Sequence, residues 1–177
     1  AMSFGGVDEY VYGPSSLISD KYAISFWFKS DCNNCGILSW SNAPLGVSDR
    51  DIWLNNGNLR ASISIAGSTT ETIQTSGTDF ADGRWHHVVH TFGLIGTGPT
   101  DIGQRLFVDG MERRRGSQKA STFTFVSPGP GINIGYSSKG VDHPYFSGMI
   151  ANLKVYDTAM DNTHTNPANP DSPFVLY

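Results

Sequence analysis

Residues 82–92, DGRWHHVVHTF, predict a central β-strand that follows a turn and carries three histidines within five positions. Three imidazoles so close together are compatible with a metal site, an acid–base centre or a packed strand. Successive side chains of a strand point to opposite faces, so His87 shares a face with Trp85, while His86 shares the other with His90. The three rings therefore cannot converge on one metal. We predict histidines that pack and form hydrogen bonds within a sheet covered on both faces.

Short alternating segments separated by turn residues run along most of the chain. In YAISFWFKS, residues 22–30, three apolar side chains alternate with Ser25, Trp27 and Lys29. Two dipeptides favour the tight turns of β-hairpins, namely Asn56-Gly57 and Asp109-Gly110. No segment carries the apolar stripe of an amphipathic helix. About ten to twelve short strands with regular turn signals predict an all-β, two-sheet antiparallel sandwich.

Composition agrees with this fold class and argues against nucleic acid and membranes as partners. The chain has 177 residues, 20 of them glycine and 9 proline, and aromatic residues make up 12%. This length suits one domain with a sizeable core. The net charge of -4 disfavours nucleic acid as a partner. Since no apolar run approaches the length of a membrane span, we expect no membrane insertion.

The two cysteines form one closely spaced pair in SDCNNCGIL, residues 30–38. A zinc site would need two more well-spaced ligands, and a thioredoxin-like motif would open a helix after a strand. Here Asn33-Asn34 lies in a turn between two expected strands. We expect a disulfide between Cys32 and Cys35, formed in an oxidising compartment, with two unpaired thiols as the alternative.

Several segments in order resemble one known family. DGRWHHVVHTF is followed by QRLFVDG (104–110), INIGY (132–136) and YFSGMIANLKVYDTAM (145–160), and the opening MSFGGVDEYV and ISFWFKS fit as well. Together they resemble the laminin G-like domain of the concanavalin A-like lectin/glucanase superfamily. The resemblance implies a jelly-roll sandwich over residues 1–163. Residues 164–177 are rich in Pro and Asn, and we expect a C-terminal tail or linker there.

The glucanases of that superfamily carry carboxylates spaced two residues apart on one strand, so that they flank a glycosidic bond. VDEYV has adjacent acidic residues that point to opposite faces, TTETI has one, and FVDGMERR separates its acidic residues by a turn. Neither a nucleophile elbow nor a phosphate-binding loop is present. We therefore expect a domain that is not an enzyme.

Strand parity predicts where a ligand would bind. If one strand precedes INIGY, the loops at residues 41–51, 94–103 and 136–145 share one end of the sandwich, where binding residues concentrate. We expect Trp53 to stack on a sugar there, and Trp27, Trp40 and Trp85 to lie in the core. The expected carbohydrate-binding residues are Asp49, Arg50, Asp51, Trp53, Asp101, His143 and Tyr145.

Two further sites stay open. ERRRGSQK, residues 112–119, supplies a dense positive patch that suits a sulfated glycan or a charged edge strand, formed by Arg105, Arg113, Arg114, Arg115 and Lys119. The resemblance also implies a calcium ion at Asp49 or Asp51. However, residues 116–130 contain no carboxylate and no Asn, and Ala151 and Asn152 replace the acidic residues usual in the family. No cofactor other than calcium is expected.

We therefore expect a non-catalytic carbohydrate-binding or adhesion module of a larger modular protein, placed outside the cell or at its surface. Its partners would be glycans or a cell-surface polysaccharide and other domains of the parent chain, with no nucleic acid. The alternative is a structural or protein-interaction module of a surface protein or fibre without a sugar site. A third hypothesis is a divergent polysaccharide-cleaving enzyme.

Overall fold

The structure is a computed structural model, and it describes most of the 177 residues. The described residues are 1–14, 21–41, 44–46, 48–65, 68–77, 79–94, 102–117, 131–140, 142–156 and 159. Asp101, Lys119 and the expected tail at 164–177 lie outside them. The domain boundary at residue 163 therefore stays a prediction.

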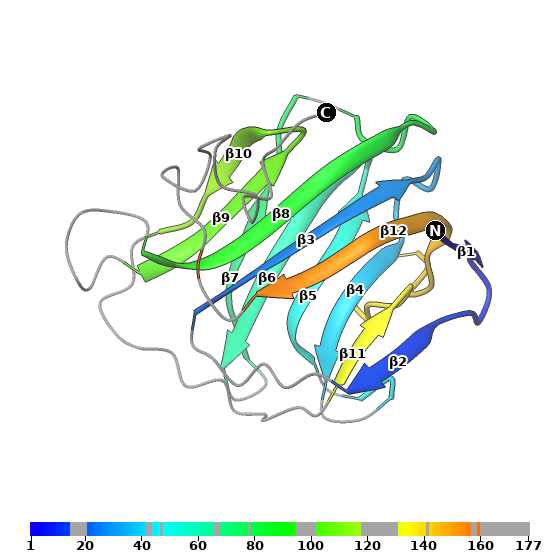
Figure 1. The fold of residues 1–177 in the computed structure, drawn as a ribbon, viewed down its shortest axis with the longest axis horizontal. Helices are drawn as coiled ribbons and strands as arrows, with labels where there is room; N and C mark the ends of the chain where they lie inside the picture. The colour runs from blue at the N-terminus through cyan, green and yellow to red at the C-terminus, as the bar shows by residue number, and fades with distance from the viewer. Residues whose placement is uncertain are drawn as a thin grey trace.

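Two antiparallel sheets of six strands each stack face to face, which confirms the predicted all-β jelly-roll sandwich (Figure 1). The first sheet, called sheet A, consists in spatial order of β1 (Met2–Gly5), β12 (Ser147–Tyr156), β3 (Tyr22–Lys29), β8 (Trp85–Leu94), β9 (Ile102–Val108) and β10 (Met111–Arg115). The second, called sheet B, consists of β2 (Val11–Pro14), β11 (Gly131–Ile134), β4 (Gly36–Ser41), β5 (Ser48–Asn55), β6 (Asn58–Ile65) and β7 (Ser68–Gln74). No helix of the described residues is long and apolar enough to cross a membrane.

The two predicted hairpin turns are confirmed. Asn56 and Gly57 have φ angles of 48° and 71°, and Asp109 and Gly110 have φ angles of 53° and 76°. Two successive positive φ angles match the twist of the flanking strands, and Asn, Asp and Gly accept them most easily. The first turn joins β5 to β6, and the second joins β9 to β10.

The core lies between the sheets and follows the predicted alternation. Ile24, Phe26 and Phe28 of β3 are fully buried against the inner face of sheet B, which contributes Ile52 and Leu54. Burying one such side chain stabilises the fold by about 1.5–3 kcal/mol. A smaller cluster continues the core with Tyr22, Ile63, Phe92 and Ile102.

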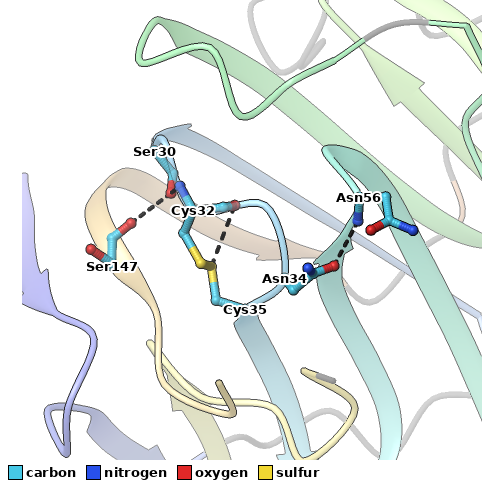
Figure 2. The surroundings of a disulfide bond; sticks show 6 residues. All are labelled: Ser30, Cys32, Asn34, Cys35, Asn56 and Ser147. Carbon is cyan, nitrogen blue, oxygen red and sulfur yellow. Dashed lines mark hydrogen bonds between the residues drawn. A yellow bond between two sulfur atoms is a disulfide. The ribbon is translucent and has the colours of Figure 1, made fainter. Parts of the chain in front are cut away.

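A disulfide joins Cys32 and Cys35 in the turn between β3 and β4, as expected (Figure 2). The Ser30 hydroxyl donates to the carbonyl oxygen of Ser147 at 2.6 Å and accepts from the amide of Cys32 at 2.9 Å. The amide of Asn56 donates to Oδ1 of Asn34 at 2.8 Å. These bonds tie the disulfide turn to β12 and to the β5–β6 hairpin.

Candidate functional site

The histidines of β8 lie on opposite faces of sheet A, and all three are buried. His86 faces the core side, where its Nδ1 lies 2.8 Å from Oδ2 of Asp109 and its Nε2 lies 3.0 Å from Oδ1 of Asp82. His87 lies on the outer face, with its Nε2 2.8 Å from the hydroxyl of Ser25. These partners confirm the prediction that the histidines pack and form hydrogen bonds.

His90 is part of a polar group buried between the sheets. Its Nε2 lies 3.0 Å from Oε1 of Gln104, and its Nδ1 lies 3.3 Å from the hydroxyl of Tyr22. Burial lowers the pKa of His90 to about 4, and the nearby Arg50 guanidinium acts in the same direction. Arg50 itself packs over the Tyr22 ring at 5.1 Å. His90 is therefore neutral at physiological pH, and its hydrogen bonds link β3, β8 and β9 within sheet A.

The expected loop site at one end of the sandwich is wrong because β11 runs in the opposite direction from that assumed. Gly131 pairs with Ser41 and Ile134 with Leu38, so the chain leaves β11 at the end where β4 begins. The amide of Gly36 there donates to the carbonyl oxygen of His143 at 3.0 Å. The segment at 136–145 thus lies at the disulfide end, whereas the β4–β5 connection lies at the other end. The strand that was assumed to precede β11 falls outside the described residues.

Trp53 cannot stack on a sugar in this structure, because only 4% of its surface is exposed. It lies on the outer face of sheet B, opposite to Ile52, with Gly36 as its register partner. The backbone of Ser137 and Pro144 packs against Gly36, so the segment after β11 covers this face. The expectation that Trp53 is an exposed sugar platform is therefore wrong.

The charged side chains of β5 are buried as well. The Asp51 carboxylate accepts the hydroxyls of Ser48 at 2.8 Å and Ser137 at 2.6 Å. The guanidinium of Arg50 donates to Oδ1 of Asp49 at 3.0 Å. Burial raises the pKa of both carboxyls. These residues stabilise the interior and do not form a ligand-accessible surface.

The same contacts do not fit the calcium ion that the resemblance implied. Calcium takes six to eight oxygen ligands, several of them charged. Asp49 is paired with the cation of Arg50, and both oxygens of Asp51 accept serine hydroxyls. Within the described ranges, no three His, Cys, Asp or Glu side chains form a group that could hold a metal. We derive no role for calcium.

The remaining expected binding residues do not gather. His143 is exposed at the disulfide end, and Asp101 lies outside the described residues. Tyr145 is half-buried, with its ring centroid 5.2 Å from that of Tyr136 and 6.4 Å from that of Tyr10. Tyr145 therefore packs mainly within a small aromatic cluster.

The predicted basic patch is also reduced. Arg105 is only 6% exposed, because it pairs with Thr91 on a covered part of the sheet. The guanidinium of Arg113 lies 5.8 Å from the Phe80 ring centroid. Arg115 donates to Glu112 at 2.8 Å. The expectation that Arg105 belongs to an exposed patch is therefore wrong. Lys119 lies outside the described residues. Among the described arginines of the patch, only Arg114 is exposed and has no described partner.

A different surface, on the outer face of sheet A, has the character of a ligand site. Trp85 is 40% exposed, and Trp27 on the neighbouring strand is half-buried. Together with Ala151 and Asn152 of β12, they line an open pocket of about 330 Å³. This volume is at the small end of the range for ligand sites, whose walls are mainly aromatic with a few polar groups. We call this surface the tryptophan platform.

The backbone of β12 keeps the tryptophan platform open. Ala151 is the register partner of Trp27, and its small side chain leaves the indole uncovered. The register then shifts between Ala151 and Lys154, and Asn152 in this bulge has a φ of 50°. Bulges of this kind redirect side chains and occur often beside functional sites. The exposed Asn152 amide thus supplies a polar group beside two indoles.

Further along β8 and β9 this outer face is buried, which makes the platform distinct. Val89, Thr91 and Phe107 share the face of Trp85 but are at most 3% exposed. Further along β8, Ala159 lies against Gly93. Exposed aromatic surface is therefore retained at the disulfide end of the sheet. The expectation that Trp27 and Trp85 lie in the core was wrong, whereas Trp40, at 2% exposure, is in the core as expected.

Comparison with known proteins places the chain in a family. A laminin G family model, described as the concanavalin A-like lectin/glucanases superfamily, matches residues 4–164. The chain therefore belongs to the laminin G type of this superfamily, as the resemblance implied. A search of curated proteins found no match.

Solved structures share the fold at low sequence identity. Mouse laminin α1 chain domains LG4-5 superpose with a TM-score of 0.64 at 14% identity, over 90% of this chain and 41% of that one. The CBM40 of the Ruminococcus gnavus IT-sialidase, solved with α2,3-sialyllactose, superposes with a TM-score of 0.62 at 16% identity. The match covers 92% of this chain and 94% of that one. A heptameric SAP-like pentraxin from Limulus polyphemus superposes with a TM-score of 0.67 at 17% identity, over 97% of this chain and 82% of that one. The chain thus spans under half of the laminin chain that it matches.

Proposed function

We propose that this domain is a non-catalytic carbohydrate-binding module and that its sugar site is the tryptophan platform. The observation that carries the proposal is the pair of neighbouring indoles, the exposed Trp85 and the half-buried Trp27, on the outer face of sheet A. The apolar C–H faces of a pyranose ring pack on indole rings, and the amide of Asn152 can donate to and accept from hydroxyl groups. A site of this kind binds sugars without any group for bond cleavage.

Two further observations support the proposal. One solved structure of the same fold is a carbohydrate-binding module with a bound sialylated sugar, and laminin domains also share the fold. The disulfide between Cys32 and Cys35 is typical of proteins that fold in oxidising compartments. We therefore propose an extracellular or cell-surface location and a role as one module of a larger adhesive protein.

Binding of the full chain to a panel of neutral and acidic oligosaccharides tests the proposal. The decisive variant is Trp85→Ala, because this side chain is exposed and its loss leaves the core intact. The matched control is Val11→Ala, an exposed apolar residue on β2 of the other sheet. We expect Trp85→Ala to weaken binding by about tenfold to a hundredfold, as for an aromatic residue worth about 1–3 kcal/mol. The platform would be rejected as a sugar site if the wild type binds no oligosaccharide. It would also be rejected if Trp85→Ala binds as tightly as Val11→Ala.

Release of reducing sugar from the same oligosaccharides separates a binding module from a cleaving enzyme. We expect none above the level of a blank without protein. If sugar is released and Asp51→Asn abolishes the release, the domain is an enzyme and the non-catalytic proposal is wrong.

A further inference from the structure

Two lysines flank the tryptophan platform on its own face of sheet A. Lys29 follows Trp27 by two positions on β3 and is the register partner of Trp85. Lys154 on β12 is the register partner of Ser25, which precedes Trp27 by two positions. Directly paired and alternate residues share a face, so both lysines lie on the indole side. The two positions are four residues apart along β3, which corresponds to about 13 Å.

Neither lysine is neutralised by a neighbour. Both are exposed, and among the residues with described positions neither has an ion-pair or hydrogen-bond partner. Across β8, the Asp109 carboxylate has its own partners: Oδ1 accepts the amide of His87 at 2.9 Å, and Oδ2 contacts His86. The platform therefore has a positive charge at each end along β3.

The charge of Lys154 reaches the platform. Burial is the main cause that lowers the pKa of His87; the Asp109 carboxylate raises it, and the Lys154 ammonium lowers it by a smaller amount. The ring of His87 lies 5.1 Å from that of Trp27, centroid to centroid. Lys154 is therefore close enough to act on the imidazole that packs beside the Trp27 indole.

We infer that the tryptophan platform selects anionic sugars, whose carboxylate or sulfate groups are bound by Lys29 and Lys154 while a ring stacks on Trp27 and Trp85. This inference rests on the proposed function and adds the chemical class of the ligand. The charge arrangement favours it, since an anionic sugar can pair with two ammonium groups that contribute nothing to the binding of a neutral one. The domain as a whole is acidic, with a net charge of -4, so the positive ends are a local feature.

The test compares matched neutral and anionic ligands by titration calorimetry. The probes are an oligogalacturonate and its fully methyl-esterified form, and a sulfated galactan oligosaccharide and its desulfated form. The proteins are the wild type, Lys29→Gln, Lys154→Gln, the double variant and Trp85→Ala. Arg114→Gln is the matched control, because it removes one exposed positive charge from β10 of the same sheet.

We expect an anionic probe to bind more tightly than its neutral form. Each lysine variant should weaken that binding by about twofold to fivefold, the range for exposed charge pairs, and should leave neutral probes unaffected. The difference should shrink as salt is raised. Which of the two anionic probes binds better identifies carboxylate or sulfate as the recognised group.

Other outcomes separate the two proposals. Equal affinity for charged and neutral probes, with Trp85→Ala weakening both, would overturn the inference and leave the proposed function standing. Loss of anion binding in Arg114→Gln but not in the double lysine variant would also overturn it. If no probe binds, both proposals fail. If polyglutamate binds the wild type as tightly as the anionic sugars and Trp85→Ala does not weaken it, the surface binds acidic peptide and the inference is wrong.

Discussion

Trp27 and His87 lie side by side across β3 and β8, with ring centroids 5.1 Å apart and planes inclined at 36°. The Ser25 hydroxyl holds the imidazole from one side, at 2.8 Å from its Nε2. The histidine is only 6% exposed, so it supports the indole from within the sheet and offers little surface to a ligand.

The first prediction concerns this supporting role. His87→Gln should lower the free energy of unfolding by about 1–3 kcal/mol, because the buried hydrogen bond to Ser25 is lost. Glycan binding by the folded fraction should change by less than about twofold, well under the effect of removing an aromatic contact. Urea unfolding and calorimetry on the same preparation check both statements. An unchanged stability combined with lost binding would show that His87 contacts the ligand.

The second prediction concerns the pH dependence of stability. The pKa of His90 is about 4 in the folded domain, compared with about 6.5 for a histidine in an unfolded chain. Between these values the unfolded state binds more protons, so this group destabilises the fold as pH falls from about 6.5 to about 4, by at most about 3 kcal/mol. Burial raises the pKa of Asp49 and Asp51, and these carboxyls act in the opposite direction above pH 3.8.

Because the two effects oppose each other, the histidine is best observed on its own. The NMR signals of the His90 ring should remain those of the neutral form from pH 8 down to about pH 5. A midpoint near the ordinary value of about 6.5 would contradict the buried polar cluster that His90 forms with Gln104 and Tyr22.

The fold could be predicted from local patterns. Alternation along residues 85–92 assigned the histidines to the correct faces, since a strand has a fixed period of two. The Asn56-Gly57 and Asp109-Gly110 steps predicted hairpins because few residues tolerate two positive φ angles. The alternation and the turn dipeptides are both local, so they can be recognised without knowing which distant segments pack against them.

The site could not be predicted in the same way. Alternation placed Trp53 on the face opposite Ile52, but a strand pattern does not indicate what covers that face. The segment after β11 does so, and its end of the sandwich depends on strand direction. One signal for the tryptophan platform was present: Trp27 shares the polar face of an amphipathic strand with Ser25 and Lys29.

The third prediction concerns the disulfide. Cys32→Ser should leave a folded domain that is less stable by about 2 kcal/mol, because the closed loop is short. The hydrogen bonds of Ser30 and Asn34 at this turn remain available to hold it. Chemical unfolding of the variant and thiol counting by mass spectrometry check the prediction. Two free thiols in the wild-type protein, made under oxidising conditions, would show that the disulfide between Cys32 and Cys35 does not form.

The fourth prediction concerns calcium. The thermal midpoint and glycan affinity should be the same in EDTA and in millimolar calcium chloride, since Asp49 and Asp51 are already paired with Arg50 and serine hydroxyls. A ligand present at a hundred times its dissociation constant would stabilise the fold by about 2.7 kcal/mol, which a melting curve resolves easily. A rise in the midpoint with calcium, abolished by Asp51→Asn, would show that calcium binds at Asp51.

The fifth and most direct test uses the protein's own fluorescence. Trp40 and Trp53 are 2% and 4% exposed, whereas Trp85 is 40% exposed, so acrylamide should quench mainly the platform tryptophans. We predict that saturation with a bound acidic oligosaccharide reduces this quenching and that Trp85→Ala removes most of the quenchable emission. If the oligosaccharide binds while the quenching of Trp85 stays unchanged, the sugar lies elsewhere and the central claim is contradicted.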